Sequence, residues 1–305
     1  MRKGILRALY QAKGYISGEL ISKRLGISRV AVWKHIQILK REGYIIDASP
    51  KGYKLISSPD LLLPDEFIGL RQKVYYLKEV SSTMDVAKKL AKRGEEAIVI
   101  AETQTSGRGR LGRRWHSQKG GIYFTIILRP RIGPAHAQII NLMAAVSVAR
   151  AIRSLFNLEA KLKWPNDVLI RGKKVCGILA EMEAEMDVIK FVNLGIGINA
   201  NNPISLYEEG ATSIKEEIGR DISRKELLMC VLNEIEKRRS LLGEEIISEW
   251  KALSSTINKK VRIIMQDEVV EGEAIDIDTD GALILRTDKG IRRIIAGDCI
   301  HLNDK

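Results

Sequence analysis

The chain has 305 residues, of which 45% are hydrophobic and 29% charged, so it is long enough for about two or three domains with buried cores. No apolar run reaches the roughly 18 residues that a membrane span needs, and the first residues do not resemble a signal peptide. The three cysteines form no C-x-x-C pair and the four histidines are scattered. These features exclude a disulfide scaffold and a Cys or His metal site, and they predict a soluble protein of the reducing cytosol.

Positive charge is concentrated in two parts of the chain. The formal net charge is +12, and residues 1–60 contain twelve Lys and Arg against four Asp and Glu, a net of +8. Between Glu102 and Glu159 there is no acidic residue, whereas nine Lys and Arg occur there. A generally basic, soluble protein would spread its charge more evenly. The two basic regions therefore predict two anionic partners.

The first basic region predicts three short helices followed by a small hairpin. Ser17 and Ser28 are placed to cap the second and third helices, and a glycine follows each of these helices. Two helices joined by a short turn that contains glycine form the helix-turn-helix arrangement. Residues 44–55, with a turn at Ser49-Pro50-Lys51-Gly52, predict a β-wing behind it.

The third helix carries side chains of the types that contact phosphates and base edges. Outside its apolar face these are Arg29, Lys34, Gln37 and Arg41. An ordinary three-helix unit with a solvated basic face would show the same pattern. The local charge of +8 and the wing favour DNA binding instead, and we expect these four residues to carry it.

Residues 57–64, which include two serines and two prolines, predict a linker. Beyond it, helices and strands alternate to about residue 250. Helices are expected from Ser82 or Thr83 and from Pro134, and the expected strands are 97–101, 121–128, 162–170, 175–186 and 188–195. Consecutive strands joined by short turns predict an α+β domain with a mixed or antiparallel sheet covered by helices on one side, and not a doubly wound parallel sheet.

From about residue 257 the chain consists of short β-rich runs. The dipeptides Asp280-Gly281 and Lys289-Gly290 separate these runs at about ten-residue spacing, which predicts a small β-barrel. We therefore expect three domains, with boundaries at 1–60, 65–255 and 256–305.

Residues 107–112 match the pattern G-x-G-x-x-G, but their context excludes a dinucleotide-binding fold. That fold needs a helix directly after the glycines and an acidic residue about 20 positions later. Here a strand follows, and the next acidic residue is Glu159. What remains is a loop of three glycines with Arg108, Arg110, Arg113 and Arg114, and such a loop suits a polyanion such as ATP. Mutual repulsion of the four arginines predicts that the empty loop is mobile; the alternative is a solvated surface loop.

Two further clusters stand next to expected elements. The turn Lys163-Trp164-Pro165-Asn166-Asp167 is explained by turn chemistry alone. Lys174, however, opens an apolar strand, so its ammonium group could lie in a pocket and bridge two anions. Ser81-Ser82-Thr83 stands at a helix start, where free amides and hydroxyls bind anions or simply cap the helix.

Together these motifs resemble one family, the biotin protein ligases. They occur in the family's order: Ser82-Thr83, Gln104, Gly107 to Arg113, Trp115, the Lys-Trp-Pro-Asn-Asp turn, Lys174-x-x-Gly177-Ile178-Leu179 and Gly195-Ile196-Gly197-Ile198-Asn199. The basic helix-turn-helix makes the chain similar to the bifunctional members, which also repress the biotin operon. The resemblance covers nearly all of the chain.

The resemblance implies a class II synthetase-like central domain and an SH3-like barrel at the C-terminus. It implies that biotin and ATP react to biotinyl-5′-AMP and pyrophosphate, and that biotin then passes to a lysine of a biotin carboxyl carrier protein, which releases AMP. The implied partners are that carrier protein, operator DNA and a second copy in a homodimer. Magnesium would accompany ATP, with no structural metal site, and the protein would be cytoplasmic.

The resemblance also assigns roles to residues. Biotin or its adenylate would be bound by Ser82, Thr83, Gln104, Arg108, Gly109, Arg110, Trp115, Lys174 and Gly177. Trp115 would enclose the adenine end, Asn166 and Asp167 would lie near the phosphates and magnesium, and Lys174, Arg108 and Arg110 would be catalytic. Two positions depart from the family pattern. Met84 replaces a common asparagine and is left out of the biotin contacts, and Gln118-Lys119 replaces a common serine-proline.

Two other functions are compatible with the same motifs. One is an enzyme that activates lipoate or octanoate on the same fold, although the arginine loop and the N-terminal module favour biotin. The other is a ligand-sensing transcription regulator without catalysis, for which a missing Lys174 or a broken glycine loop would be typical.

Overall fold

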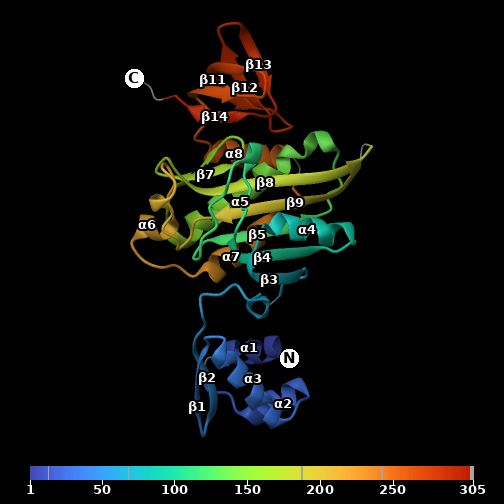
Figure 1. Ribbon diagram of the computed structural model, residues 1–305, viewed down its shortest axis with the longest axis vertical. Coiled ribbons are helices and arrows are strands. Elements are labelled where there is room, and N and C mark those ends of the chain that lie inside the picture. The colour runs from blue at the N-terminus through green and yellow to red at the C-terminus, as the bar shows by residue number, and fades with distance from the viewer. Residues whose placement is uncertain (13, 68, 187, 242, 303–305) are drawn as a thin grey trace. The chain divides into compact units, whose positions relative to one another are not determined.

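The computed structural model describes residues 1–12, 14–67, 69–186, 188–241 and 243–302 (Figure 1). The chain forms two compact units, Met1–Arg71 and Gln72–Lys305.

The first unit is a winged helix-turn-helix, as predicted. It contains three helices and an antiparallel hairpin: α1 (Arg2–Gln11), α2 (Gly18–Leu25), α3 (Arg29–Arg41), β1 (Ile45–Ser49) and β2 (Gly52–Ser57). The Ser17 and Ser28 hydroxyls accept hydrogen bonds of 3.1 Å from the amides of Leu20 and Ala31, so both expected caps are present. The apolar faces of the three helices meet in one buried cluster, which includes Ile36.

The segment after the wing is attached to this unit. A 3-10 turn, η1 (Pro64–Glu66), places the buried Glu66 carboxylate where it accepts hydrogen bonds from the hydroxyls of Tyr10, at 2.8 Å, and Tyr44. Burial is the main reason, and the Glu66 carboxylate the second, that the pKa of Tyr44 is raised above its usual value. Residues 64–66 therefore fold with the helices of the first unit.

The second unit is built on a seven-stranded mixed sheet in the order β3-β4-β5-β9-β8-β7-β6. The strands are β3 (Lys73–Val80), β4 (Ala97–Gln104), β5 (Ile122–Leu128), β6 (Ala160–Lys163), β7 (Asp167–Ile170), β8 (Lys173–Glu185) and β9 (Val188–Ile198). Only β3 and β4 pair in parallel among these ladders; the other pairs are antiparallel. The predicted mixed sheet is confirmed.

Two strands differ from the prediction. Strand β3 was not predicted, and the single strand expected over 162–170 is instead the hairpin of β6 and β7. Pro165 lies in the turn between them, and a proline has no N–H with which to continue a ladder.

Helices cover both faces of the sheet, so the expectation of helices on one side is wrong. Helix α4 (Thr83–Lys92) packs on β4, β5 and β9, whereas α5 (Gln138–Phe156) packs on β6, β7 and β8 and on two further helices, α7 (Arg224–Arg238) and α8 (Gly243–Leu253). Every residue of β5 is buried, which requires cover on both sides. The short helix α6 (Ile214–Ile218) begins at the capping box of Ser213 and Glu216.

Helix α5 is long and apolar enough to cross a membrane by length and composition alone. However, 61% of its most apolar window is buried inside the protein, and the core helix of a soluble protein meets the same criteria. Its composition is therefore weak evidence for a membrane span.

The C-terminal part is a five-stranded antiparallel sheet in the order β13-β12-β11-β10-β14. Its strands are β10 (Lys259–Ile264), β11 (Val269–Ile277), β12 (Leu283–Thr287), β13 (Gly290–Ile294) and β14 (Asp298–His301). Of these five strands, the prediction missed only β14. Trp164 joins this sheet to the central domain, because its indole N–H donates to the Gly281 carbonyl and its backbone N–H to Thr256 Oγ1, both at 3.0 Å.

This junction contains a titratable group. Thr256 Oγ1 lies 3.0 Å from His301 Nε2, and burial, with the charges of Lys163 and Lys259, lowers the pKa of His301 to about 4. The unfolded chain therefore binds this proton more readily, and the stability that His301 contributes is complete above about pH 6.5 and is lost as the pH falls toward 4. We expect the free energy of unfolding to fall by at most about 2 kcal/mol from this source by pH 5. Urea denaturation of the wild type and His301→Gln at pH 7 and pH 5 measures the difference; equal pH dependence would contradict the assignment.

Candidate active site in the central domain

A pocket opens at the start of α4 and the ends of the central strands. Its cavity volume is about 130 Å3. All eleven residues predicted for the central domain line it: Ser82, Thr83, Gln104, Arg108, Gly109, Arg110, Trp115, Asn166, Asp167, Lys174 and Gly177. Segments up to 95 positions apart in sequence thus converge on one cavity.

One wall of the pocket is a chain of polar side chains. Ser82 caps α4, and Thr83 donates to Gln104 Oε1 through its backbone N–H at 2.8 Å and through its hydroxyl at 3.1 Å. Thr125 donates to the Thr83 hydroxyl at 2.8 Å, and Gln104 Nε2 donates to Ser117 Oγ at 2.8 Å. Because each group has a partner, the orientation of the Gln104 amide is fixed and the wall is preorganised.

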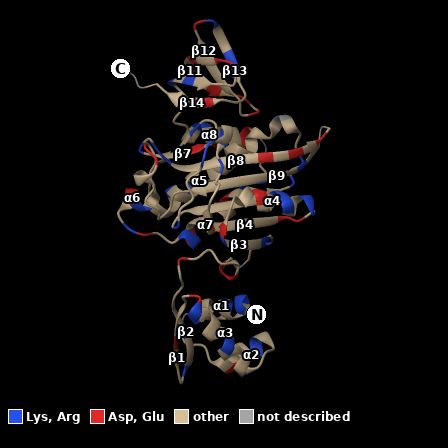
Figure 2. Cartoon of the chain, viewed as in Figure 1, with Lys and Arg blue, Asp and Glu red and all other residues tan. Residues whose placement is uncertain are grey.

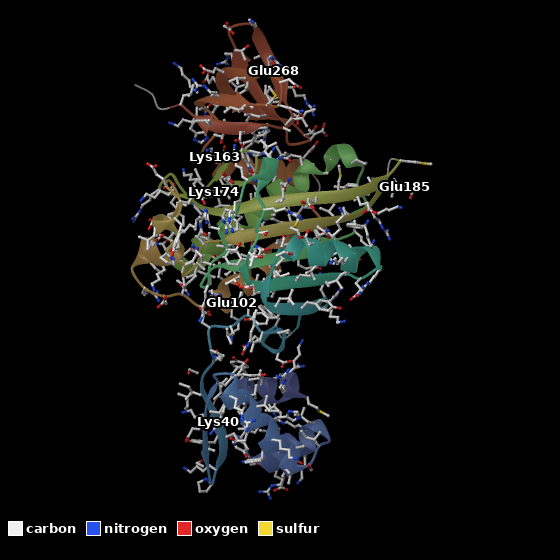
Figure 3. All side chains as sticks on the ribbon, in the orientation of Figure 1. Lys40, Glu102, Lys163, Lys174, Glu185 and Glu268 are labelled. Carbon is white, nitrogen blue, oxygen red and sulfur yellow. The ribbon has the colours of Figure 1, made fainter. Side chains whose placement is uncertain are left out.

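Lys174, which lines the same pocket, supplies a positive charge there; Figure 3 labels its side chain in the central domain. Its Nζ lies 2.8 Å from Asp167 Oδ1 and 5.4 Å from the centre of the Trp115 ring. Its backbone is held on both sides, because its N–H donates to the Gly210 carbonyl at 2.8 Å and its carbonyl accepts from Thr212 at 3.0 Å. The ammonium group is therefore placed by a rigid strand start and faces a carboxylate and an aromatic ring.

The turn before β7 places Asp167. Asn166 Nδ2 donates to the Ile178 carbonyl at 2.6 Å, and the Ile178 N–H donates back to the Asn166 carbonyl at 3.0 Å. This reciprocal pair ties the turn to β8, the strand that begins with Lys173-Lys174. The ion pair of Lys174 and Asp167 thus joins two segments whose backbones are already fastened together.

Two glycines of the pocket pack against the indole ring of Trp115. A Cβ atom at Gly197 would lie 2.4 Å from Trp115 Nε1, and one at Gly177 would lie 2.8 Å from Trp115 Cζ3. Real Cβ atoms do not come this close, so both positions must lack a side chain if the indole is to lie where it does. Trp115 Nε1 is buried without a hydrogen-bond partner in the described part of the chain, which leaves a donor at the pocket for a ligand.

Gly197→Ala is therefore expected to displace the Trp115 ring and to weaken ligand binding, since overpacking a filled site commonly costs about 1–3 kcal/mol. The change should appear as a raised KM for the ligands of this pocket and as altered tryptophan fluorescence. Gly133→Ala is the matched control, because the nearest atom to its Cβ would be 3.9 Å away. Unchanged KM and fluorescence in Gly197→Ala would show that the ring does not depend on this glycine.

The arginine loop crosses the mouth of the pocket. It includes the 3-10 turn η2 (Arg110–Gly112), and Arg108 binds two carboxylates, Asp85 of α4 at 2.8 Å and Glu181 of β8 at 3.5 Å. Arg113 forms an ion pair with Asp298 at the start of β14. Acidic residues from distant parts of the chain therefore offset the charge of Arg108 and Arg113, two of the four loop arginines. The mobility of the empty loop stays a prediction.

Among the loop arginines that line the pocket, Arg110 is partly buried. It lies in the pocket lining and donates to the Gly297 carbonyl at 3.3 Å. Burial lowers its pKa, the charge of Asp167 opposes that shift, and Arg113 adds to it. A guanidinium remains protonated despite such a shift, so a partly desolvated cation faces the cavity with unused donors.

The pocket has further lining residues beyond these eleven. The arginine loop and the quoted motifs already contained Arg113, Arg114, Ile178, Leu179, Gly195, Ile196 and Gly197, although no binding role was assigned to them individually. Sequence reasoning missed Met84, Phe124, Glu208 and Asp298. Met84, which the prediction left out of the biotin contacts, is 4% exposed and lines the pocket over Gly195, where a Cβ would lie 2.6 Å from its sulfur. Its position next to Ser82-Thr83 could have indicated that Met84 lines the pocket. No sequence pattern indicated this for Glu208 and Asp298, because they lie in segments outside the motifs.

The four predicted DNA-binding residues lie in the first unit and line a different surface. All are on α3, where Arg29, Lys34 and Arg41 are exposed and Gln37 is half-buried. Figure 2 shows Lys and Arg in blue on the helices of this unit. They form no part of the pocket in the central domain.

Comparison with known proteins assigns families to three segments. The Biotin/lipoate A/B protein ligase family matches residues 76–199, an HTH domain matches residues 2–54, and the biotin protein ligase C-terminal domain matches residues 256–302. The bifunctional ligase/repressor BirA of Bacillus subtilis is 38% identical over 317 aligned positions that cover 98% of each chain. The BirA of Escherichia coli is 31% identical over 96% of this chain and 95% of its own.

A solved structure agrees with this result. Biotin protein ligase from Aquifex aeolicus, in complex with biotin and ATP, superimposes with a TM-score of 0.65 and 29% identity. The match covers 77% of this chain and all of the other.

Proposed function

This chain belongs to the biotin protein ligase family, and we propose that its central pocket converts biotin and ATP into biotinyl-5′-AMP and passes biotin to a lysine of a biotin carboxyl carrier protein. With its helix-turn-helix it is also a DNA-binding repressor of biotin synthesis genes. One observation carries the catalytic assignment: Lys174, Asp167 and Arg110 line the same cavity as the polar wall of Ser82, Thr83 and Gln104.

The reaction has two steps. A biotin carboxylate oxygen attacks the α-phosphorus of ATP and pyrophosphate leaves, which gives a mixed anhydride. The amine of the carrier lysine then attacks the acyl carbon, AMP leaves, and the lysine loses a proton to form the amide. The first step brings two anions together, so the protein contributes mainly by positioning them and by neutralising charge.

Lys174 is placed to act on both anions. In the absence of ligand, its ammonium group is paired with Asp167 at 2.8 Å. When the carboxylate and the α-phosphate enter, the same ammonium group contacts both, because it is a compact cation with three rotatable donors. Arg110, and Arg108 from the loop above, neutralise the remaining phosphate charge. The closed loop also keeps water from the acyl-adenylate.

Magnesium is expected with ATP, and the donor set fits this role. Mg2+ is usually bound by one or two carboxylates together with substrate phosphates, and Asp167 supplies a carboxylate in the pocket beside Asn166. No group of three His, Cys, Asp or Glu that could hold a metal ion alone is found among the described residues. When bound, the ion would neutralise phosphate charge, and Asp167 and Asn166 would orient it.

The remaining assignments complete this proposal. The predicted domain boundaries were 1–60, 65–255 and 256–305; because residues 64–66 fold with the first unit, we end the DNA-binding domain at Arg71 and begin the catalytic domain at Gln72. We place Arg29, Lys34, Gln37 and Arg41 on the DNA. A single helix-turn-helix reads few base pairs, so two copies in a homodimer would bind paired half-sites. Bound biotinyl-AMP would favour that dimer. A carrier protein that competes for the dimer surface would relieve repression. The proposed location of the protein is the cytoplasm.

The ligase activity is tested by biotin transfer to a carrier domain. The purified full chain, ATP and a carrier domain are incubated with biotin, lipoate or octanoate, and the mass of the carrier lysine is measured. Modification with biotin alone is expected. Preference for octanoate or lipoate would favour the other acyl group, and no modification with any acid would favour a regulator without catalysis.

Arg108→Gly is expected to release biotinyl-AMP faster, because it removes both ion pairs that tie the loop to α4 and β8. The leaked adenylate should label lysines of a bystander protein, and the dissociation rate can be followed in a stopped-flow chase. Arg131→Gly, an exposed arginine outside the loop, is the control. If adenylate dissociation is unchanged in Arg108→Gly, the loop does not act as a lid.

A further inference from the structure

The recognition helix α3 carries an apolar stripe on its exposed side. Val30 and Trp33 are spaced by three residues and so lie on one face of the helix, and the polar Gln37 follows them on that face. Val30 is 63% exposed and Trp33 is 52% exposed, whereas Val32, Ile36 and Leu39 on the opposite face are fully buried. The stripe is therefore not part of the core of this unit.

This apolar stripe lies in the most basic part of the protein. Arg29, Lys34 and Arg41 flank it on the same helix, and none of them forms an ion pair among the described residues of the unit. An exposed tryptophan and valine surrounded by free cations do not suit a basic protein partner. They suit a polyanion that also presents apolar groups.

Val30 and Trp33 line a groove between the start of α3 and the wing. Ser49 and Pro50 of the wing also line it, so both parts of the module that approach DNA contribute to it. In helix-turn-helix proteins the N-terminal residues of the recognition helix contact base edges in the major groove. Val30 is the second residue of α3 and lies at that end.

We propose that Val30 and Trp33 form an apolar contact with the 5-methyl group of thymine in the operator half-site. Thymine is the base that presents a methyl group in the major groove, and apolar side chains recognise it. Arg29 beside them suits guanine O6 and N7 or a phosphate. This inference rests on the proposed DNA-binding function and adds a base preference to it.

The test compares thymine with deoxyuridine, which differs by this methyl group alone. A duplex is first selected from random DNA by the full chain in the presence of biotin and ATP. Each thymine of the half-site is then replaced by deoxyuridine, and the affinity of the wild type, Val30→Ala, Trp33→Ala and Val30→Ile is measured. Ile56→Ala is the matched control, because Ile56 is 55% exposed on β2 outside the recognition helix.

For the wild type, removing the contacted methyl group is expected to weaken binding about fourfold at one thymine of the half-site. Val30→Ala and Trp33→Ala should each lose this preference. In either variant, replacing the contacted thymine by deoxyuridine should therefore weaken binding no further. Val30→Ile and Ile56→Ala should keep it.

Four results would overturn the inference, and they differ in what else they overturn. Wild-type binding that is equal with thymine and deoxyuridine removes the methyl contact but leaves DNA binding intact. A preference that persists in both Val30→Ala and Trp33→Ala assigns the methyl contact to other residues. If Val30→Ala changes self-association and not DNA affinity, the stripe binds a second copy of the chain. Failure of the wild type to select any DNA would refute the proposed repressor function itself.

Discussion

Replacing Lys174 by alanine is expected to slow biotin-dependent pyrophosphate release about 10²- to 10³-fold, the range for loss of one transition-state donor. Lys174 is the lysine that lines the pocket, and its backbone is held by Gly210 and Thr212, so its removal should not disturb β8. Loss of its side chain also leaves the Asp167 carboxylate without its pair, which further repels the incoming phosphates.

Lys173→Ala is the control for this experiment, because Lys173 is the exposed neighbour on the same strand and does not line the pocket. Pyrophosphate release by Lys173→Ala should match the wild type. Thermal denaturation of both variants shows whether the fold is retained. A wild-type rate in Lys174→Ala would show that Lys174 does not act on the reacting anions.

Deleting residues 1–71 is expected to abolish operator binding and to leave the ligase reaction largely intact. Residues 1–60 carry +8 of the net charge of +12, and every lining residue of the central pocket lies beyond Arg71. The deletion should end at Arg71 because Glu66 is hydrogen-bonded to Tyr10 and Tyr44 and would lose these partners if the cut came earlier. Operator binding is measured by fluorescence anisotropy, and ligation by carrier biotinylation.

A second variant separates charge from folding in the same experiment. Lys34→Ala with Arg41→Ala in the full chain removes two exposed cations of α3 and leaves the buried cluster of the unit unchanged. If both contact phosphates, the slope of log Kobs against log salt should fall by about 2. An unchanged slope would exclude them from the DNA contacts, and operator binding by the 72–305 fragment would contradict the assignment to the first unit.

The N-terminal unit could be predicted closely because its signals are local. Ser17 and Ser28 stand directly before their helices, and the apolar positions of α3 follow one helical face. Strand β3 gave no comparable signal: it lies at the edge of the sheet and most of its residues are half-buried, so its pattern is neither continuous nor alternating.

The pocket residues could be predicted from motifs, but their mutual geometry could not. The partners of the loop arginines, Asp85, Glu181 and Asp298, come from a helix, a strand and the C-terminal sheet. No spacing in the sequence relates them to residues 107–114. The close approach of Trp115 to Gly197 likewise depends on packing between the loop and β9.

The central claim is that one pocket holds both biotin and ATP and joins them. It is tested most directly by incubating the purified full chain with α-labelled ATP, with and without biotin, in the absence of any carrier protein. The account predicts labelled biotinyl-5′-AMP that remains bound to the protein, with one pyrophosphate released for each adenylate, only when biotin is present. Pyrophosphate release without biotin, or no adenylate in its presence, would contradict it.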